Sequence, residues 1–212
     1  MDSFKGSMTS MEAGLAAKEG IHQVMPDAEV VVRPLADGGE GTMEALAEGL
    51  GGKMYSVNVS DPLERVVLAK YCLVEEPETG MKTAVIEMAQ AAGLTLLTEE
   101  ERNPNQTTTY GVGEMIRDAI ARGCRDFIVG IGGSATNDGG MGMLQALGYR
   151  FLDKGGRELT GGAESLGEEY EISDANILTE LSQCRFRIAC DVENPLCGPN
   201  GATYIYAPQK GL

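Results

Sequence analysis

The sequence contains no tryptophan, a single histidine, His22, and five cysteines without any Cys-x-x-Cys spacing. Without paired cysteines, His22 cannot complete a zinc set of the usual spacing, so we expect no ordinary structural zinc site. The odd number of cysteines also argues against a disulfide framework, and we expect reduced thiols. His22 falls on the first expected helix, where we expect it to be exposed, so a histidine general base is not expected either.

Positive charge is also scarce: 17 Lys and Arg residues stand against 32 Asp and Glu residues, for a net charge of −15. Nucleic acids and anionic membranes bind clustered lysine and arginine, so this balance argues against both as partners. No stretch is long and apolar enough to span a membrane, and the first five residues lack the apolar core of a signal peptide. We therefore expect a soluble, cytoplasmic protein that binds a small molecule.

The Walker pattern GxxxxGK[ST] is missing as well, which excludes an ordinary P-loop enzyme. A different glycine-rich stretch, FIVGIGGSATNDGG, occupies residues 127–140 and is followed by the apolar segment 141–147. This pattern indicates a buried strand, a tight loop and a helix, and it fits either a plain turn or a phosphate site. We favour the phosphate site, because glycines let the backbone approach an anion while the amides of the loop and of the helix start supply a positive field. The candidate ligands are Gly130, Gly132, Gly133, Ser134, Thr136 and Asn137.

Hydrophobic periodicity and turn residues predict an α/β fold along the rest of the chain. Three short strands between residues 54 and 87 are separated only by turns, which indicates an antiparallel meander and a domain boundary near residue 54. Expected helices span residues 11–24, 112–120 and 141–147, with a further one between the glycine loop 34–42 and residue 50. Expected strands span residues 28–33, 54–59, 66–74, 83–87, 149–152, 185–190 and 203–207.

Three of the expected loops carry an aspartate beside glycines or other turn residues: Asp37, Asp138 and Asp191. Ligands of open α/β sheets bind outside the carboxyl ends of the strands, so these aspartates are expected to meet at one crevice. Taken singly, each could instead be a turn former or a helix cap.

Phosphoryl transfer requires donors for the phosphates, a divalent cation and a carboxylate that orients the attacking hydroxyl. Magnesium prefers hard oxygen ligands, so Asp37, Glu40 and Asp138 are its candidate ligands. Asp191 is the candidate for orienting the hydroxyl. Lys5 and Lys210 lie in loops that contain glycine and could bind a phosphate or a substrate carboxylate.

Two other chemistries can be weighed against phosphoryl transfer. Cys190 and Cys197 lie near Asp191, but no histidine is near them in sequence to activate a thiol, so we interpret both as packing residues. The pattern Gly130-x-Gly132-x-x-Ala135 satisfies the loose dinucleotide fingerprint, with Asp153 at the end of the next expected strand, and predicts an NAD-dependent oxidoreductase. Against this reading, Asp138 would place a negative charge close to the pyrophosphate.

Five blocks of the sequence, taken in order, resemble the glycerate kinase type-1 family. They are DSFKGSM at 2–8, PLADGGEGT at 34–42, TTTYGVG at 107–113, GIGGSATNDGGMG at 130–142 and NPLCGPNGA at 194–202. The resemblance extends from end to end and implies ATP-dependent phosphorylation of D-glycerate with magnesium. In the bacterial members of the family, the implied product is 2-phosphoglycerate.

The same resemblance implies two α/β domains, one flavodoxin-like and one with a mixed sheet. Residues 1–53 are expected to form the N-terminal part of the flavodoxin-like domain, and residues 54–212 the second domain. Family chains normally begin with an apolar strand before Asp2 and continue well past Gly211. The chain is therefore expected to be truncated at both ends, with an incomplete flavodoxin-like domain.

Chemical plausibility within the matching blocks adds hypotheses for further residues. Substrate binding is assigned to Asp2, Ser3, Asn194 and Lys210, phosphate binding also to Gly38 and Gly39, and catalysis to Asp191 with Lys5. Three functions stay open at this point: a glycerate kinase, with a homo-oligomer as a further option, an NAD-dependent oxidoreductase, and a non-catalytic fragment of the kinase.

Overall fold

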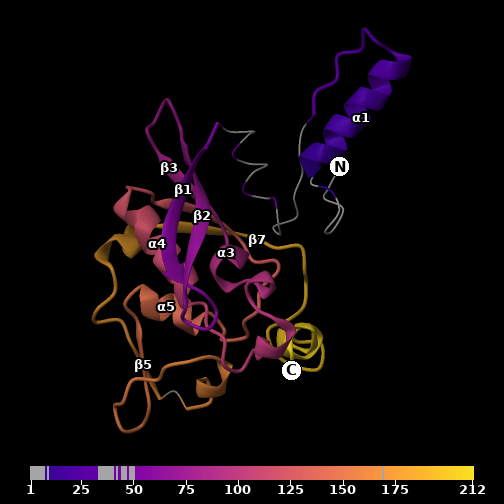
Figure 1. Cartoon of the computed structure of the whole chain (residues 1–212). Coiled ribbons are helices and arrows are strands. Elements are labelled where there is room, and N and C mark those ends of the chain that lie inside the picture. The colour runs from indigo at the N-terminus through magenta and orange to yellow at the C-terminus, as the bar shows by residue number, and fades with distance from the viewer. Residues whose placement is uncertain are drawn as a thin grey trace.

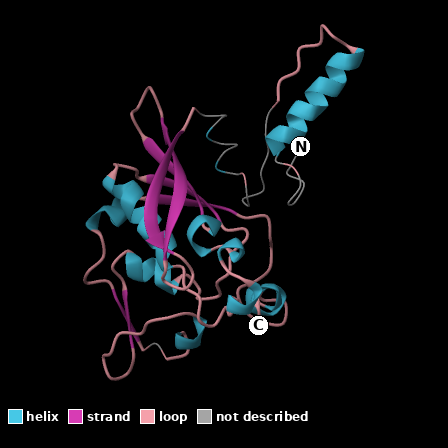
Figure 2. Ribbon diagram, in the orientation of Figure 1, coloured by secondary structure: helices cyan, strands magenta, loops and turns pink. Residues whose placement is uncertain are grey.

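The structure, a computed structural model, describes residues 8, 10–32, 41, 43, 47, 51–168 and 170–212. Its centre is a five-stranded sheet with the order β1-β2-β3-β4-β7 (Figures 1 and 2). The strands are β1 Lys53–Ser60, β2 Val66–Glu75, β3 Lys82–Glu87, β4 Asp126–Gly130 and β7 Arg185–Ala189. Strand β2 pairs antiparallel with both β1 and β3, whereas β3, β4 and β7 run parallel to one another. The expected α/β class, with a mixed sheet and an antiparallel meander, is confirmed.

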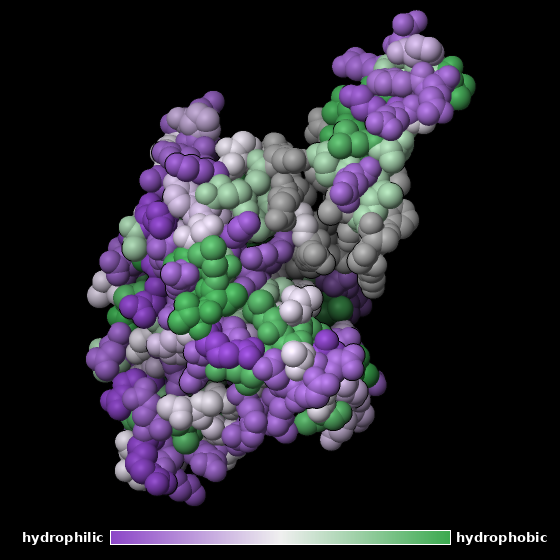
Figure 3. Space-filling view, viewed as in Figure 1, coloured by the Kyte–Doolittle hydropathy of each residue, from purple (hydrophilic) through white to green (hydrophobic). Residues whose placement is uncertain are grey.

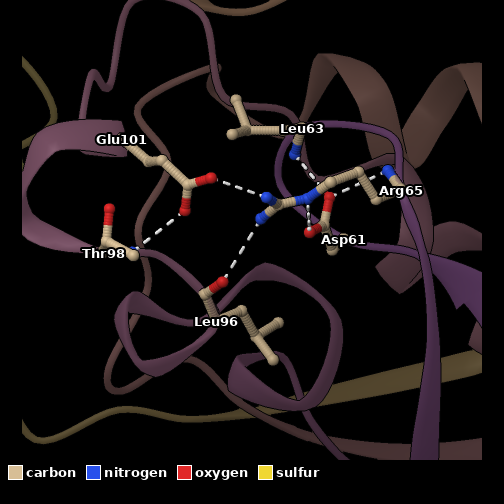
Figure 4. Close-up of polar contacts among 6 residues, drawn as sticks. All are labelled: Asp61, Leu63, Arg65, Leu96, Thr98 and Glu101. Carbon is tan, nitrogen blue, oxygen red and sulfur yellow. Dashed lines mark hydrogen bonds and ion pairs between the residues drawn. The ribbon is translucent and has the colours of Figure 1, made fainter.

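The turn between β1 and β2 is held by a buried carboxylate, Asp61, which is 5% exposed (Figure 4). Its Oδ1 accepts hydrogen bonds from the amides of Leu63 and Arg65 at 2.8 and 2.9 Å, and its Oδ2 accepts one from Arg65 Nε at 2.6 Å. Arg65 Nη1 donates in turn to Glu101 Oε1 at 2.6 Å. The hairpin is thereby joined to the segment that leads into Thr107 and the following helix.

Helix α4, Tyr110–Ala121, packs against β1 and β2 and also against helix α5, Met141–Ala146. Residues at helical spacing on α4 are buried, as the sequence pattern predicts, among them Val112, Met115 and Ile116. Gly113 permits the close approach of α5, because a Cβ there would meet the Met143 carbonyl oxygen and would come within 2.6 Å of Ala146 Cβ.

The core between α4 and the sheet contains Tyr71 and Phe127, both 0% exposed. The Tyr71 hydroxyl donates to Asp118 Oδ2 on α4 at 2.6 Å, which satisfies a polar group at the edge of this core. Burial, together with this hydrogen bond, raises the pKa of the Tyr71 phenol. The core therefore depends on Tyr71 remaining protonated.

The remaining helices and strands are short, apart from the first helix. They are α1 Ser10–Val24, α3 Ala89–Ala92, α6 Ala202–Tyr206, β5 Arg150–Leu152 and β6 Glu171–Ser173, with 3-10 turns at Leu94–Leu96, Glu99–Glu101, Ala163–Ser165, Thr179–Gln183 and Pro208–Lys210 (η5). Strands β5 and β6 form a separate antiparallel pair. Helix α1 stands apart from the sheet in Figure 1, and Figure 3 shows hydrophobic atoms on its surface, where Leu15, Ile21 and Val24 are exposed.

Two expected strands are wrong. Residues 203–207 are rich in β-prone side chains, but most of them form helix α6, because Ile205 and Ala207 donate locally to the carbonyls of Gly201 and Thr203. Residues 28–32 form no strand, since no described strand lies beside them to supply the pairing hydrogen bonds.

The cysteines follow the expected chemistry only in part. No disulfide joins any of the five, all of which are among the described residues. Cys72 and Cys124 are buried, and burial raises the pKa of Cys124 to about 11. Cys190 and Cys197 are exposed, so their interpretation as packing residues is wrong. Both lie in the irregular segment after β7, where no described helix or sheet covers them.

Candidate functional site

The carboxyl ends of the three parallel strands lie side by side. Glu87 of β3 pairs in register with Gly130 of β4, and Gly130 pairs with Ala189 of β7. The chain segments that follow these residues therefore leave the sheet at the same edge, which is the usual ligand-binding edge of such sheets. The loops after β4 and β7 therefore begin side by side. The expected meeting of Asp37, Asp138 and Asp191 at one crevice stays a prediction, because Asp37 lies outside the described residues.

The glycine loop after β4 is anchored through a few specific backbone bonds. Gly133 has φ of 71°, a conformation that favours glycine, and its carbonyl accepts the Leu94 amide at 2.9 Å. Ala135 donates to the Ala92 carbonyl at 2.8 Å. Within the described part of the chain, nothing accepts a hydrogen bond from the amides of Gly132, Gly133 or Ser134. The loop therefore holds three consecutive amides without a described partner.

Asp138 is directed into the protein and is only 1% exposed. Its Oδ2 accepts hydrogen bonds from Thr109 N at 2.8 Å, Thr109 Oγ1 at 2.7 Å and Gly142 N at 3.1 Å, while Oδ1 accepts one from Gly140 N at 3.0 Å. This is the cap geometry considered as the alternative role of such an aspartate. The carboxylate keeps almost no accessible surface for a metal ion.

The start of α5 does not supply the amides that the sequence pattern suggested. Met141 N donates to the Asp138 carbonyl at 3.0 Å, Gly142 N to the Asp138 side chain and Met143 N to Thr109 Oγ1 at 2.9 Å. Because these donors are used inside the protein, they do not supply hydrogen bonds to a phosphate, and the expected contribution of the helix start to the positive field stays a prediction. The unpartnered amides before Asp138 are the better candidates.

Lys210 is brought to the glycine loop from the far end of the chain. Its Nζ donates to Ser134 Oγ at 2.8 Å and to the Thr136 carbonyl at 2.7 Å, and the residue is only 8% exposed. Burial lowers the pKa of Lys210, and the negative charge of Asp138 opposes this shift. Three residues that sequence analysis assigned to ligand binding, Lys210, Ser134 and Thr136, are therefore in direct contact.

The loop after β7 contains Asp191 and Asn194, both exposed. The Asn194 side chain is used within the loop: Nδ2 donates to the Asn200 carbonyl at 3.1 Å, and Oδ1 accepts from the Tyr206 hydroxyl at 2.5 Å. Asp191 makes no hydrogen bond to any residue the structure describes, so its carboxylate is available for chemistry. Its role as the group that orients a hydroxyl stays a prediction.

Several predicted site residues lie outside the described residues. They are Asp2, Ser3, Lys5, Asp37, Gly38, Gly39 and Glu40. Two of the three candidate magnesium ligands are in this set, and the described side chains include no group of three or more His, Cys, Asp or Glu arranged to hold a metal. The magnesium site therefore also stays a prediction.

Comparison with known proteins identifies the family. The model of the glycerate kinase family matches residues 1–212, the whole chain. The chain belongs to the glycerate kinase family. Its relatives include a glycerate kinase from Halalkalibacterium halodurans, 45% identical, and a glycerate 2-kinase from Escherichia coli, 44% identical, each over 210 residues that cover 99% of this chain.

Solved structures agree with the family assignment. A crystal structure of a candidate glycerate kinase 2 from Salmonella typhimurium LT2 has a TM-score of 0.88 and 43% identity, and the match covers 100% of this chain. The same match covers 55% of that chain, and the two sequence relatives are covered over 54% of their length. The chain thus spans about half the length of the glycerate kinases it matches.

Sequence analysis missed two contributors to this candidate site. Glu87 is 4% exposed at the end of β3, and its Oε1 accepts the amide of Met43 at 2.8 Å, which joins Met43 to the carboxyl end of this strand. Thr109 holds Asp138 and the start of α5. The signals were a glutamate that ends an apolar strand and a run of three threonines before a helix.

A separate groove lies along α4, away from the sheet edge. It has a volume of about 470 Å³ and is lined by Glu114, Arg117, Asp118, Ile120, Ala121, Leu178 and Glu180. Burial acts to raise the pKa of Asp118, but hydrogen bonds from Arg122 and Tyr71 outweigh it and the net shift is downward. None of the predicted site residues that the structure describes lines the groove, so we do not assign it as the candidate active site.

Among the residues the structure describes, none belongs to a helix with the length and apolar character required to cross a bilayer.

Proposed function

We propose that this protein acts as an ATP-dependent glycerate kinase, which transfers the terminal phosphoryl group of ATP to D-glycerate and forms 2-phosphoglycerate. The proposal is supported by the family match over the whole chain and by relatives named glycerate kinase and glycerate 2-kinase. The oxidoreductase alternative gains no support from these relatives. The chain covers 54% of the length of each of these two relatives.

The single observation that carries the chemistry is the row of amides at Gly132, Gly133 and Ser134, which have no described partner and lie at the carboxyl end of β4. Consecutive backbone N–H groups in a glycine loop form a concave site for phosphate oxygens. The protein as a whole has a net charge of −15 and repels anions, so these N–H groups would provide a local attraction for the phosphates.

The remaining roles are assigned around this loop. Phosphate contacts are proposed for the loop residues Gly130, Gly132, Gly133, Ser134, Thr136 and Asn137, with Gly38 and Gly39 from the second glycine loop. We propose Asp37 and Glu40 as magnesium ligands, and we reassign Asp138 from metal binding to capping because its oxygens are occupied. Asp2, Ser3 and Asn194 are proposed for glycerate binding, although the Asn194 side chain already has partners within its loop.

Catalysis is proposed for Asp191 with Lys5. Asp191 lies at the same sheet edge as the glycine loop, since Ala189 pairs with Gly130 two residues before it. A carboxylate there can orient the glycerate hydroxyl toward the phosphoryl group. The cytoplasm is the proposed location, because ATP and free thiols occur together there. Association of the protein with itself is left to measurement.

The decisive experiment measures ADP formation from ATP with D-glycerate and magnesium. Coupling the product directly to enolase, without a mutase, identifies 2-phosphoglycerate. Asp191→Asn is expected to lower the rate at least a hundredfold, whereas Asp174→Asn, an exposed aspartate between β6 and β7, is expected to leave it unchanged. Binding of NAD without binding of ATP would instead favour the oxidoreductase. A protein that binds ATP but forms no ADP would identify the non-catalytic fragment.

A further inference from the structure

The glycine loop is held by a second part of the chain, the segment 202–210, which comprises α6 and η5. Two side chains make the contact. Thr203 Oγ1 exchanges hydrogen bonds with the Asn137 side chain at 3.1 and 3.3 Å, and Lys210 Nζ donates to Ser134 and Thr136. These partners are separated by 66 to 76 positions in sequence, so the contact is made by the tertiary fold alone.

The backbone fixes Lys210 in this position. Its own amide donates to the Ala207 carbonyl at 2.9 Å, and the amide of Leu212 donates to the same carbonyl at 3.1 Å. Gly211, with φ of 99°, packs so closely on Arg102 that a Cβ would meet the Arg102 carbonyl oxygen. The side chain therefore enters the protein from a rigid turn.

Burial of a lysine is costly unless its donors are used. Lys210 is 8% exposed and directs two of its three N–H groups to the loop itself, one to a hydroxyl and one to a carbonyl. A lysine that binds a diffusing carboxylate would present its donors to solvent. Here they are committed to the protein segment that carries the unpartnered amides of Gly132, Gly133 and Ser134.

We propose that Lys210 is a positioning residue for the glycine loop: through Ser134 and Thr136 it holds the amides of residues 132–134 in the arrangement that receives a phosphate. The inference deepens the proposed kinase function and rests on it for the identity of the ligand. It replaces the assignment of Lys210 to glycerate binding. The lysine acts on nucleotide affinity through the loop and leaves the affinity for glycerate unchanged.

The test compares Lys210→Met with Lys154→Met, which removes an exposed lysine from the turn that follows β5. Hydrogen–deuterium exchange followed by mass spectrometry reports the order of residues 131–140, and a titration with Mg·ADP reports nucleotide binding. For Lys210→Met we expect exchange in this loop to be about tenfold faster and ADP binding about tenfold weaker. The KM for D-glycerate should stay within twofold, and Lys154→Met should resemble the parent protein.

Ser134→Ala provides a second variant that removes only one of the two acceptors. It is expected to make hydrogen exchange in the loop about threefold faster and ADP binding about threefold weaker. If Lys210→Met raises exchange throughout the protein, Ser134→Ala is the variant that tests the positioning role. Unchanged loop exchange in Lys210→Met would overturn the inference, as would a rise in the glycerate KM without weaker ADP binding. If the parent protein binds no ADP, the kinase proposal fails, while the exchange measurement still decides whether Lys210 orders the loop.

Discussion

Replacement of Asp138 separates a structural carboxylate from a metal ligand. In Asp138→Ala, four donors lose their acceptor: the amides of Thr109, Gly140 and Gly142 and the hydroxyl of Thr109. A buried donor left unsatisfied costs about 1–3 kcal/mol. Even at the lower end of that range, the four together predict a loss of about 4 kcal/mol in the free energy of unfolding. Lys210 also loses the negative charge that offsets its burial.

Asp138→Asn should lower the free energy of unfolding much less than Asp138→Ala, because the two carboxylate oxygens share the four hydrogen bonds unevenly. Oδ2 accepts three of them and Oδ1 accepts only the one from Gly140 N, at 3.0 Å. An asparagine can place its oxygen at the Oδ2 position and keep the three bonds there. Its amide nitrogen then takes the Oδ1 position, where the N–H of Gly140 no longer finds an acceptor. The expected loss is about 1–2 kcal/mol, less than half of that for alanine.

Urea unfolding followed by circular dichroism measures both variants, with Asp174→Asn as the control on an exposed aspartate. The free energy of unfolding of this control variant should stay within about 0.5 kcal/mol of that of the parent protein. A free energy of unfolding for Asp138→Ala within about 1 kcal/mol of the parent value would refute the capping role. Weaker magnesium binding in Asp138→Asn at unchanged stability would restore the metal-ligand assignment.

Three further predictions follow from the packing. Gly113→Ala should destabilise the protein by about 1–3 kcal/mol, because α5 leaves no room for a Cβ, whereas Gly20→Ala on α1, where a Cβ meets nothing, should stabilise it by about 0.5–1 kcal/mol in the same urea assay. The pKa of Tyr71 is raised in the folded state. The protonated phenol therefore contributes fully to the free energy of unfolding below about pH 10, and this contribution is lost as the pH rises above that value. Tyr71→Phe should therefore cost about 1.5–3 kcal/mol at pH 8, and the difference from the parent should shrink toward pH 11; a constant difference would contradict the argument. Cys190 and Cys197 should react with Ellman's reagent in the native protein, while the buried cysteines react only after denaturation; protection of both exposed thiols would contradict their placement.

Local pattern was sufficient for most of the sheet and for α4. The alternation of β-prone residues and turns between residues 54 and 87 gave the antiparallel meander, and the spacing of Val112, Met115 and Ile116 gave the buried side of the helix. These features depend on neighbours a few residues away. Residues 203–207 misled the same method, since their β-prone composition was outweighed by the contacts of α6, including the Tyr206 hydroxyl bond to Asn194.

The sequence by itself determined that a glycine loop follows a buried strand, because glycine spacing and apolar runs act within about ten residues. It also placed Ser134, Thr136 and Lys210 among the functional candidates. Only the tertiary structure decided what each does: Asp138 turns inward to Thr109 across 29 positions, and Lys210 reaches Ser134 across 76. Whether a polar side chain faces solvent or a partner depends on which distant segment packs against it, and no local pattern encodes that choice.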